Sequence, residues 1–225
     1  MTLAAVLFDM DGTLIDSEPM HSEATDTVLK AVGCVAPPEI GGLMTGMSGF
    51  DCHALLVERA GLALSFDDYV AAKYAAFLKT ASSLRLRPGA AAVLQGLERQ
   101  GIAFAIVSNS DRMLMDASLA AVGLARPGLI TVSRNDVRDG KPHAEPYLRA
   151  AYLLGVDPAH CAVVEDSLPG AAAGLAAGMA VIGWPEPHRG DLAFPAGTTL
   201  AAPHDLLSTL DALIADRAAE LAFRP

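Results

Sequence analysis

The sequence predicts an α/β fold in which a doubly wound parallel sheet, covered by helices on both faces, is interrupted by an inserted all-helical segment. Apolar runs with strand character alternate with helical patterns from residue 88 to residue 183, and such repeats are typical of parallel sheets. One more strand pattern occupies residues 3–9, and between it and about residue 83 only helical patterns are convincing. We therefore expect an α/β core at residues 1–16 and 85–225 and a helical insertion at residues 17–84.

The insertion contains three helical patterns. Ser17, with Pro19 in the first turn, is typical of a helix start, and this helix is expected to run to about Val32. Two further helices are predicted at residues 51–60 and 66–79, separated by breaks rich in glycine and proline. The first break is interpreted as a loop, compatible with a moving lid or with ordinary turns, and its glycines are Gly41, Gly42, Gly46 and Gly49.

The second half of the chain is predicted to alternate helices and strands with short connections. A helix that Pro88 opens and Gly101 closes comes first. Strands are then expected at residues 102–107, 129–132, 161–165 and 179–183, with helices at 111–122, 144–154 and 168–177. Trp184, followed by Pro185 and Pro187, is interpreted as a rigid surface turn.

Composition limits the class of protein. With 225 residues, 52% of them hydrophobic and 19% charged, the chain is expected to be globular, and no uncharged run is long enough to cross a bilayer. No basic region precedes the first strand, so we expect no secretory signal and a cytoplasmic location. The 26 acidic against 16 basic residues disfavour a nucleic-acid partner. The 3 cysteines are expected to be small buried apolar residues.

Polar residues cluster where four of the predicted strands end. In parallel α/β sheets, ligands bind outside the carboxyl ends of the strands, where helix amino termini also converge. We therefore expect these side chains to meet at one edge of the sheet. The clusters are Asp9-Met10-Asp11-Gly12, Ser108-Asn109-Ser110, Gly140-Lys141-Pro142 and Glu165-Asp166-Ser167.

The acidic residues of these clusters would need a cation, because carboxylates this close cannot all stay ionised without one. Oxygen ligands with room for water suit Mg²⁺, and the candidate ligands are Asp9, Asp11, Glu165 and Asp166. Lys141 would add a second positive charge, and the Ser108 hydroxyl can hold phosphate oxygens at a helix start. A carboxylate beside them can act as a nucleophile toward a phosphoryl group, while a second aspartate moves protons.

Each cluster taken alone has a simpler interpretation. Asp-x-Asp-Gly can form only a turn, the Ser-Asn and Glu-Asp pairs can cap helices, and a lone lysine usually lies on the surface. All four clusters nevertheless follow predicted strands in chain order. This conjunction favours a site that handles phosphate.

These residues resemble the motifs of the haloacid dehalogenase-like (HAD) hydrolases. The resemblance spans the chain and implies a Rossmann-like core with a helical cap. The insertion resembles the small cap of the subfamily that holds β-phosphoglucomutase and sugar-phosphate phosphatases. The matching segments, in motif order, are Phe8-Asp9-Met10-Asp11-Gly12-Thr13-Leu14, Val107-Ser108-Asn109, Gly140-Lys141-Pro142 and Val164-Glu165-Asp166-Ser167.

The resemblance implies a role for each residue of the core motifs. Asp9 would be the nucleophile that forms an aspartyl-phosphate, and Asp11 would be the general acid/base, with its backbone carbonyl on Mg²⁺. The carboxylates of Asp9 and Asp166 would bind Mg²⁺, with Glu165 close behind. Phosphate would be bound by Gly12, Ser108, Asn109 and Lys141. Family members without the second aspartate are the dehalogenases, so Asp11 indicates phosphoryl chemistry.

Two positions separate this chain from the mutases of that subfamily. In those mutases a basic residue follows the Gly-x-Ser of the cap loop, whereas Gly49 follows Gly46-Met47-Ser48 here. A basic residue also follows their second motif, whereas Asp111 stands at that place here. Without two phosphate sites a bisphosphate intermediate would be held poorly, so water is favoured as the acceptor.

Other cap residues leave the choice open. His21 matches a histidine of the mutase hinge, but similar phosphatases also carry one. Lys73 lies where the mutase cap has a substrate-binding lysine, and it can equally be a solvated residue on an amphipathic helix. The candidate cap contacts to substrate are His21, Gly46, Ser48 and Lys73.

The sequence thus predicts a Mg²⁺-dependent phosphatase that hydrolyses a small phosphorylated metabolite, a sugar or sugar-acid phosphate, through an aspartyl-phosphate. A hexose phosphate mutase is the alternative enzyme. A phosphoacceptor signalling domain also uses acids, a hydroxyl and a lysine. Its aspartate, however, lies on a strand internal to the chain, whereas Asp9 lies near the amino terminus. A catalytically silent binding protein is disfavoured because no catalytic position of the motifs is missing.

Overall fold

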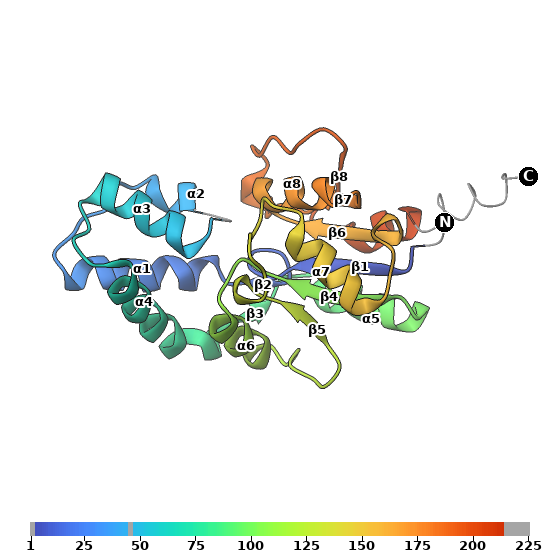
Figure 1. The fold of residues 1–225 in the computed structure, drawn as a ribbon, viewed down its shortest axis with the longest axis horizontal. Helices are drawn as coiled ribbons and strands as arrows, with labels where there is room; N and C mark the ends of the chain where they lie inside the picture. The colour runs from blue at the N-terminus through green and yellow to red at the C-terminus, as the bar shows by residue number, and fades with distance from the viewer. Residues whose placement is uncertain (1–2, 45–46, 214–225) are drawn as a thin grey trace, which may run out of the picture.

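The centre of the molecule is a six-stranded parallel sheet with the strand order β5-β4-β1-β6-β7-β8 (Figure 1). The structure is a computed structural model and describes residues 3–44 and 47–213. It confirms the predicted α/β class with a parallel sheet. The strands are β1 (Ala5–Asp9), β4 (Ala103–Val107), β5 (Ile130–Val132), β6 (Cys161–Glu165), β7 (Ala180–Gly183) and β8 (Thr198–Leu200).

The residues of β1 alternate between two apolar cores, one on each face of the sheet. Val6 and Phe8 lie in the core that α5 (Ala90–Gln100) and α6 (Arg112–Ala121) cover. Ala5 and Leu7 lie in the opposite core, under α7 (Glu145–Leu154) and α8 (Leu168–Ala176). A strand buried on both faces is typical of a doubly wound sheet. By the same alternation, Asp9 turns to the side of α7 and α8.

The helices of the insertion lie to one side of the sheet and have an apolar core of their own (Figure 1). They are α1 (Glu18–Ala31), α2 (Ile40–Met44), α3 (Gly49–Ala60) and α4 (Phe66–Thr80). The interpretation of Gly41 and Gly42 as loop residues is wrong. Both lie in α2, which forms because the buried Ile40 anchors it to the core of the insertion. Gly49 begins α3, and Gly46 lies outside the described residues.

A short antiparallel pair joins the two places where the chain crosses between insertion and core. β2 (Ile15–Asp16) pairs with β3 (Arg85–Leu86), and the backbone N–H of Arg87 donates to the carbonyl of Leu14 across 2.8 Å. Two-residue strands carry no pattern that sequence periodicity can detect. We place the proposed boundaries between core and cap at this pair.

Most predicted elements agree with the structure to within two residues, but the interpretation of Trp184 as part of a surface turn is wrong. Its side chain is fully buried, and its ring N–H donates to the carbonyl of Pro203 across 3.1 Å. The guanidinium of Arg87 lies 3.9 Å from the ring centroid, so the indole packs under a buried cation instead of facing water. Strand β8, which follows this turn, was not predicted either.

In the described ranges, no helix combines the length and the apolar character needed to cross a bilayer. The cysteines are free, and Cys52 and Cys161 are buried, as expected of small apolar residues, whereas Cys34 is only half-buried.

Candidate active site

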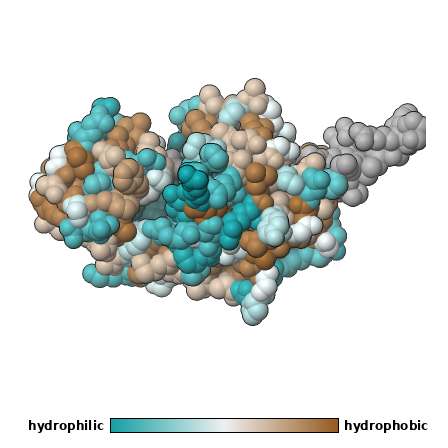
Figure 2. All heavy atoms as spheres, viewed as in Figure 1, coloured by the Kyte–Doolittle hydropathy of each residue, from teal (hydrophilic) through white to brown (hydrophobic). Residues whose placement is uncertain are grey.

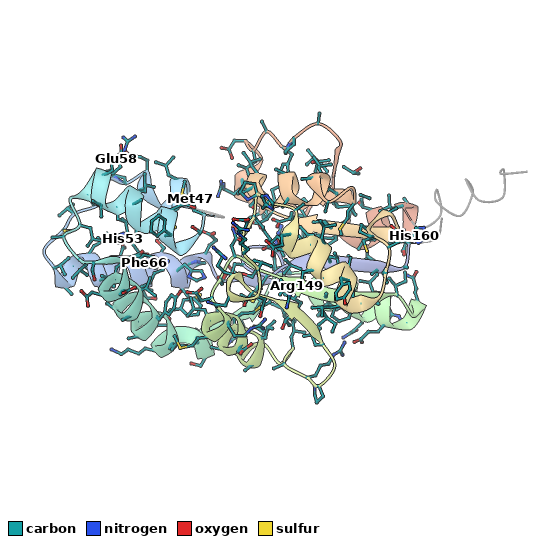
Figure 3. All side chains as sticks on the ribbon, viewed as in Figure 1. Met47, His53, Glu58, Phe66, Arg149 and His160 are labelled. Atoms are coloured by element: carbon teal, nitrogen blue, oxygen red, sulfur yellow. The ribbon has the colours of Figure 1, made fainter. Side chains whose placement is uncertain are left out.

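A cavity of about 1450 Å³ lies between the insertion and the carboxyl ends of the strands. Figure 2 shows hydrophilic side chains gathered on the surface beside the gap between the two lobes. Met47 lies on the side of the insertion that faces the sheet (Figure 3). Predicted site residues from both parts line this one cavity: Asp9, Asp11, Ser108, Asn109, Lys141 and Asp166 from the core, and His21, Ser48 and Lys73 from the insertion.

Asp9 and Lys141 form a buried ion pair at the end of β1. Lys141 Nζ donates to Asp9 Oδ1 at 2.5 Å, to Glu165 Oε1 at 2.6 Å and to the carbonyl of Val107 at 3.0 Å. Burial acts to lower the pKa of Lys141, but the two carboxylates outweigh it and raise that pKa, so the lysine stays charged. Burial raises the pKa of Asp9 well above its ordinary value, against the opposing effect of Lys141.

Asp9, Glu165 and Asp166 form a cluster that fits a metal ion. One carboxylate oxygen from each lies within 4.8 Å of the others. The pKa of Asp166 is raised to about 7 by burial and by the charge of Glu165, against the hydrogen bond from Thr13. Such an excess of buried negative charge is what a cation relieves. The donor set consists of oxygen atoms alone, which suits Mg²⁺.

Glu165 lies behind Asp166 and does not line the cavity. Its Oε1 accepts from Lys141 and from the Tyr147 hydroxyl at 2.6 Å, and its Oε2 accepts from the Ser167 hydroxyl at 2.9 Å. A Cβ on Gly170 would lie 1.8 Å from Oε1, so the carboxylate occupies space that only a glycine leaves open. Glu165 is therefore best suited to holding Lys141 in place behind the ligands that face the cavity.

The carboxylate of Asp11 turns away from this cluster and toward hydroxyl groups. Its Oδ1 accepts from the Ser17 hydroxyl at 2.7 Å and lies 3.3 Å from His21 Nε2. Its Oδ2 accepts from Ser108 at 3.0 Å and from Ser110 at 2.8 Å. Burial acts to raise the pKa of Asp11, but the hydrogen bonds from His21, Ser17 and Ser110 outweigh it and lower that pKa.

The loops after β4 and β5 are locked to each other beside Lys141. Asn109 Nδ2 donates to the Lys141 carbonyl at 3.1 Å, and the Lys141 backbone N–H donates to Asn109 Oδ1 at 2.9 Å. A Cβ on Gly140 would lie 2.7 Å from that Oδ1. Asn109 therefore positions the lysine backbone, and the Ser108 hydroxyl remains at the cavity beside Asp11.

The residues of the insertion reach the cavity in different ways. His21 stacks on Phe77 with ring centroids 4.5 Å apart, which aims its Nε2 at Asp11. Ser48 caps α3 by accepting from the backbone N–H of Asp51 at 3.2 Å, so its hydroxyl already has a structural role. Lys73 is half-buried, with its Nζ 6.0 Å from the ring centroid of Tyr69, and lines the cavity.

Sequence reasoning gave no individual role to several polar residues of the cavity wall, among them Ser110, Arg87 and Arg134. Ser110, next to Asn109, donates to Asp11. Arg87 is buried and donates to the carbonyl of Gly12 at 2.8 Å. Arg134, after β5, also lines the cavity. In the sequence, Arg87 is only a basic residue before the Pro-Gly turn. No pattern in the neighbouring residues indicates that its side chain contacts Gly12.

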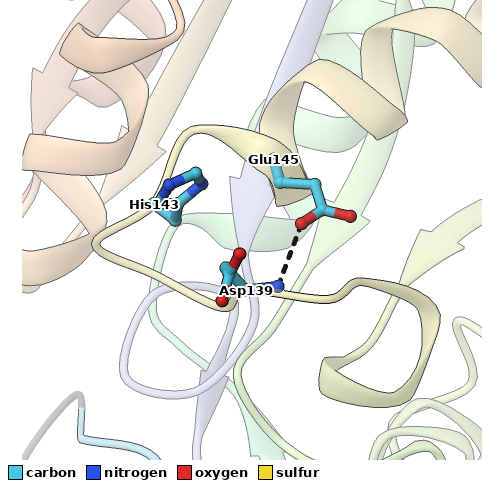
Figure 4. Close-up of side chains that lie close together, drawn as sticks. All are labelled: Asp139, His143 and Glu145. Atoms are coloured by element: carbon cyan, nitrogen blue, oxygen red, sulfur yellow. Dashed lines mark hydrogen bonds between the residues drawn. The ribbon is translucent and has the colours of Figure 1, made fainter.

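A second acidic cluster lies at the start of α7 and serves the loop that carries Lys141 (Figure 4). It consists of Asp139, His143 and Glu145. The carboxylate of Glu145 accepts from the backbone N–H of Arg138 at 3.0 Å and of Asp139 at 2.9 Å. These two bonds lower the pKa of Glu145 and give it a structural role at the helix start.

Comparisons with known proteins show a hydrolase family and several relatives that this chain resembles. A model of the haloacid dehalogenase-like hydrolases matches residues 3–178. Hexitol phosphatase A of Escherichia coli (strain K12) is 33% identical over 186 residues, which cover 81% of this chain and 83% of that protein. The plasmid-borne phosphoglycolate phosphatase of Cupriavidus necator is 35% identical over 215 residues, covering 93% and 90%. A crystal structure of a CbbY variant from Rhodobacter sphaeroides with xylulose-(1,5)bisphosphate has a TM-score of 0.79 at 26% identity, covering 89% and 94%.

Proposed function

The chain belongs to the haloacid dehalogenase-like hydrolases and is a phosphatase, and we propose that it hydrolyses a sugar phosphate or sugar-acid phosphate through an aspartyl-phosphate on Asp9. One observation carries the proposal. The Asp9 carboxylate reaches the cavity at the end of β1 with Lys141 bonded to it and Asp166 in the same cluster. A phosphoryl group there would meet a nucleophile beside the positive charge of Lys141.

In the first step an oxygen of Asp9 attacks phosphorus, and the bond between phosphorus and the leaving oxygen breaks. Lys141 and the Ser108 hydroxyl hold the phosphoryl oxygens, and Asp11 donates a proton to the leaving oxygen. A bound phosphate brings negative charge next to Asp11, which raises its pKa and lets it carry that proton. The Ser17 and Ser110 hydroxyls keep the carboxylate aimed while it does so.

In the second step water attacks phosphorus and the bond to Asp9 breaks. Asp11, now ionised, takes the proton of the attacking water and is ready for the next substrate. Inorganic phosphate leaves, and Asp9 is restored as a carboxylate beside Lys141. Asp11 therefore donates a proton in the first step and accepts one in the second.

We assign the metal site to Asp9 and Asp166, with the carbonyl of Asp11 and with Glu165 behind them, and Mg²⁺ as the ion. Bound there, Mg²⁺ would neutralise the phosphoryl oxygens as charge develops on them. Thr13 orients Asp166 by donating to its Oδ1 at 2.9 Å. The fit of the oxygen donors supports this assignment.

Water is the proposed acceptor, rather than a second hydroxyl of a sugar phosphate as in a mutase. Asp111 accepts a hydrogen bond from the Tyr74 hydroxyl of α4, so this position offers no cation. The guanidinium of Arg112 is bonded to Asp136 and to Thr131 and lies outside the cavity wall. Neither residue supports the second phosphate site that mutases carry after their second motif.

Asp9→Asn tests the mechanism, because the amide cannot attack phosphorus. We expect Mg²⁺-dependent release of phosphate from p-nitrophenyl phosphate to be abolished while the circular dichroism spectrum is unchanged. Asp26→Asn, an exposed change on α1, is the matched control and should keep wild-type turnover. Turnover retained in Asp9→Asn overturns the mechanism.

The mutase alternative is tested by following sugar phosphates directly. With a panel of hexose and pentose phosphates, we expect inorganic phosphate to accumulate and no positional isomer to form. Isomer formation stimulated by a sugar bisphosphate, with little phosphate release, would favour the mutase.

A further inference from the structure

We propose that Arg134 and Asn135 form a subsite for a second anionic group, a carboxylate or a phosphate, carried by the leaving group of the substrate. This inference rests on the proposed function, because it names a substrate class for the same cavity. Both residues lie in η2 (Arg134–Asp136), directly after β5, and both line the cavity that holds Asp9 and Lys141. The subsite belongs to the core and not to the cap loop.

The backbone of this turn is held rigid. The backbone N–H and the hydroxyl of Ser133 each donate to Asp136 Oδ2 at 2.7 Å, and the guanidinium of Arg112 pairs with the same carboxylate. The backbone N–H of Arg134 donates to the carbonyl of Ser110 at 3.0 Å. The turn is therefore fixed against the loop after β4, and a ligand bound to it would cause little reorganisation.

The side chain of Arg134 runs beside Gly140, which precedes Lys141 on the same connection. A Cβ on Gly140 would lie 3.1 Å from Arg134 Cδ and 3.4 Å from its Nε, so the glycine makes room for the arginine. Arg134 Nη1 donates to the carbonyl of Val137 at 3.0 Å, which fixes the direction of the guanidinium. This places a cation next to the phosphate site, on the same connection between β5 and α7 that carries Lys141.

The guanidinium of Arg134 has capacity for a ligand. Among residues 3–44 and 47–213 no carboxylate forms an ion pair with it, in contrast to Arg112 and Lys141. A guanidinium has five N–H donors, and the bond to Val137 uses one of them. Its planar fork matches both carboxylate and phosphate, and half-burial in a cavity strengthens such a contact.

Asn135 adds a second donor. Its Oδ1 accepts from the backbone N–H of Arg112 at 2.7 Å, which orients the amide. The Nδ2 group of the same amide is then the end that can donate to an anion. Arg134 and Asn135 together offer a charged fork and a neutral donor from one rigid turn.

The test compares substrates with and without the second anion. We measure kcat/KM for p-nitrophenyl phosphate, for 2-phosphoglycolate and for fructose 1,6-bisphosphate in the wild type, R134M and R134K. R134M is expected to lower kcat/KM at least tenfold for whichever anionic substrate the wild type prefers, and less than twofold for p-nitrophenyl phosphate. R134K keeps the positive charge but not the planar guanidinium, so its kcat/KM for that substrate should lie between the values of the wild type and R134M. A preference for 2-phosphoglycolate would indicate a subsite for a carboxylate, and a preference for fructose 1,6-bisphosphate would indicate a subsite for a phosphate.

R138M is the matched control, because Arg138 lies on the same loop but is exposed and outside the cavity wall. It should leave all three values unchanged. Equal losses for all substrates in R134M, or no loss for any, would overturn the subsite, as would a wild type that cleaves p-nitrophenyl phosphate but neither anionic substrate. A wild type inactive on all three contradicts the proposed function as well, and Asp9→Asn then has no activity to remove.

Discussion

Arg87 and Gly12 are joined by a buried hydrogen bond, in which Nη1 of the arginine donates to the carbonyl of the glycine across 2.8 Å. The same guanidinium donates to the carbonyls of Trp184 and Pro185, each at 2.6 Å. Arg87 follows β3, the strand on which the chain returns from the insertion. One side chain thus connects the return crossing with the loop that follows Asp9 and with the loop after β7.

Arg87→Met should destabilise the protein and impair turnover. The change leaves three carbonyl oxygens without their donor, and a hydrogen bond to a charged group is worth about 1.5–3 kcal/mol. We expect the free energy of unfolding, measured by urea denaturation, to fall by about 3 kcal/mol or more. Arg87→Lys should restore only part of it, because an ammonium cannot span the three acceptors as the guanidinium does.

Arg85→Met is the matched control for this prediction. Arg85 lies two residues earlier, is exposed, and donates to the carbonyls of Ser82 and Leu84. Arg85→Met should lower the free energy of unfolding by well under half as much as Arg87→Met. Equal effects at both positions would show that Arg87 has no special role in holding Gly12.

Gly12→Ala should disrupt the catalytic loop. Gly12 has φ +78, and a Cβ there would lie 2.4 Å from Asp166 Oδ2, so the aspartate must move. Gly33→Ala is a matched control, since its φ is +72 and a Cβ would contact nothing within 4 Å. Both changes carry a conformational cost of about 1–2 kcal/mol at positive φ. Only Gly12→Ala should also lose turnover in the phosphatase assay; activity retained there would contradict the close approach.

Mg²⁺ should raise the melting temperature of the wild type through Asp166. A ligand at 100 times its Kd stabilises the folded state by about 2.7 kcal/mol, and chelation should reverse the shift. Asp166→Asn should remove most of the response and the turnover with it. Asp139→Asn, in the second acidic cluster, should keep both. If Mg²⁺ raised the melting temperature of Asp166→Asn as much as that of the wild type, the metal site would have to lie elsewhere.

Tyr74→Phe should weaken the contact between insertion and core. The Tyr74 hydroxyl of α4 donates to Asp111, the residue that precedes α6. Loss of one such bond is worth about 1 kcal/mol, which corresponds to about a fivefold rise in KM if closure over the substrate uses this contact. Steady-state kinetics measure it, with Tyr152→Phe, 82% exposed on α7, as the control. An unchanged KM in Tyr74→Phe would remove this contact from the closure of the cavity.

Much of the architecture could be predicted because local patterns report burial. The alternation along β1 and the helix signals of α1, α4 and α7 record which side chains face an apolar core, and the structure confirms them. The clusters at the ends of β1, β4 and β6, with Lys141, could also be predicted to converge, since parallel strands end at one edge. The residues that follow each strand therefore decide which polar side chains meet at this edge of the sheet.

The tertiary structure decided what depends on contacts between distant segments. The turn of Asp11 toward Ser17, Ser108 and Ser110 is set by packing between three loops. The burial of Trp184 depends on Arg87, 97 positions earlier in the chain, which has no pattern of its own. A sequence pattern records the environment of a segment, whereas the partner of a polar side chain is chosen by whichever segment folding places beside it. For this reason the sequence alone determined five of the six strands of the sheet and the motif residues, whereas only the folded chain showed β8 in the sheet and Arg87 and Arg134 at the site.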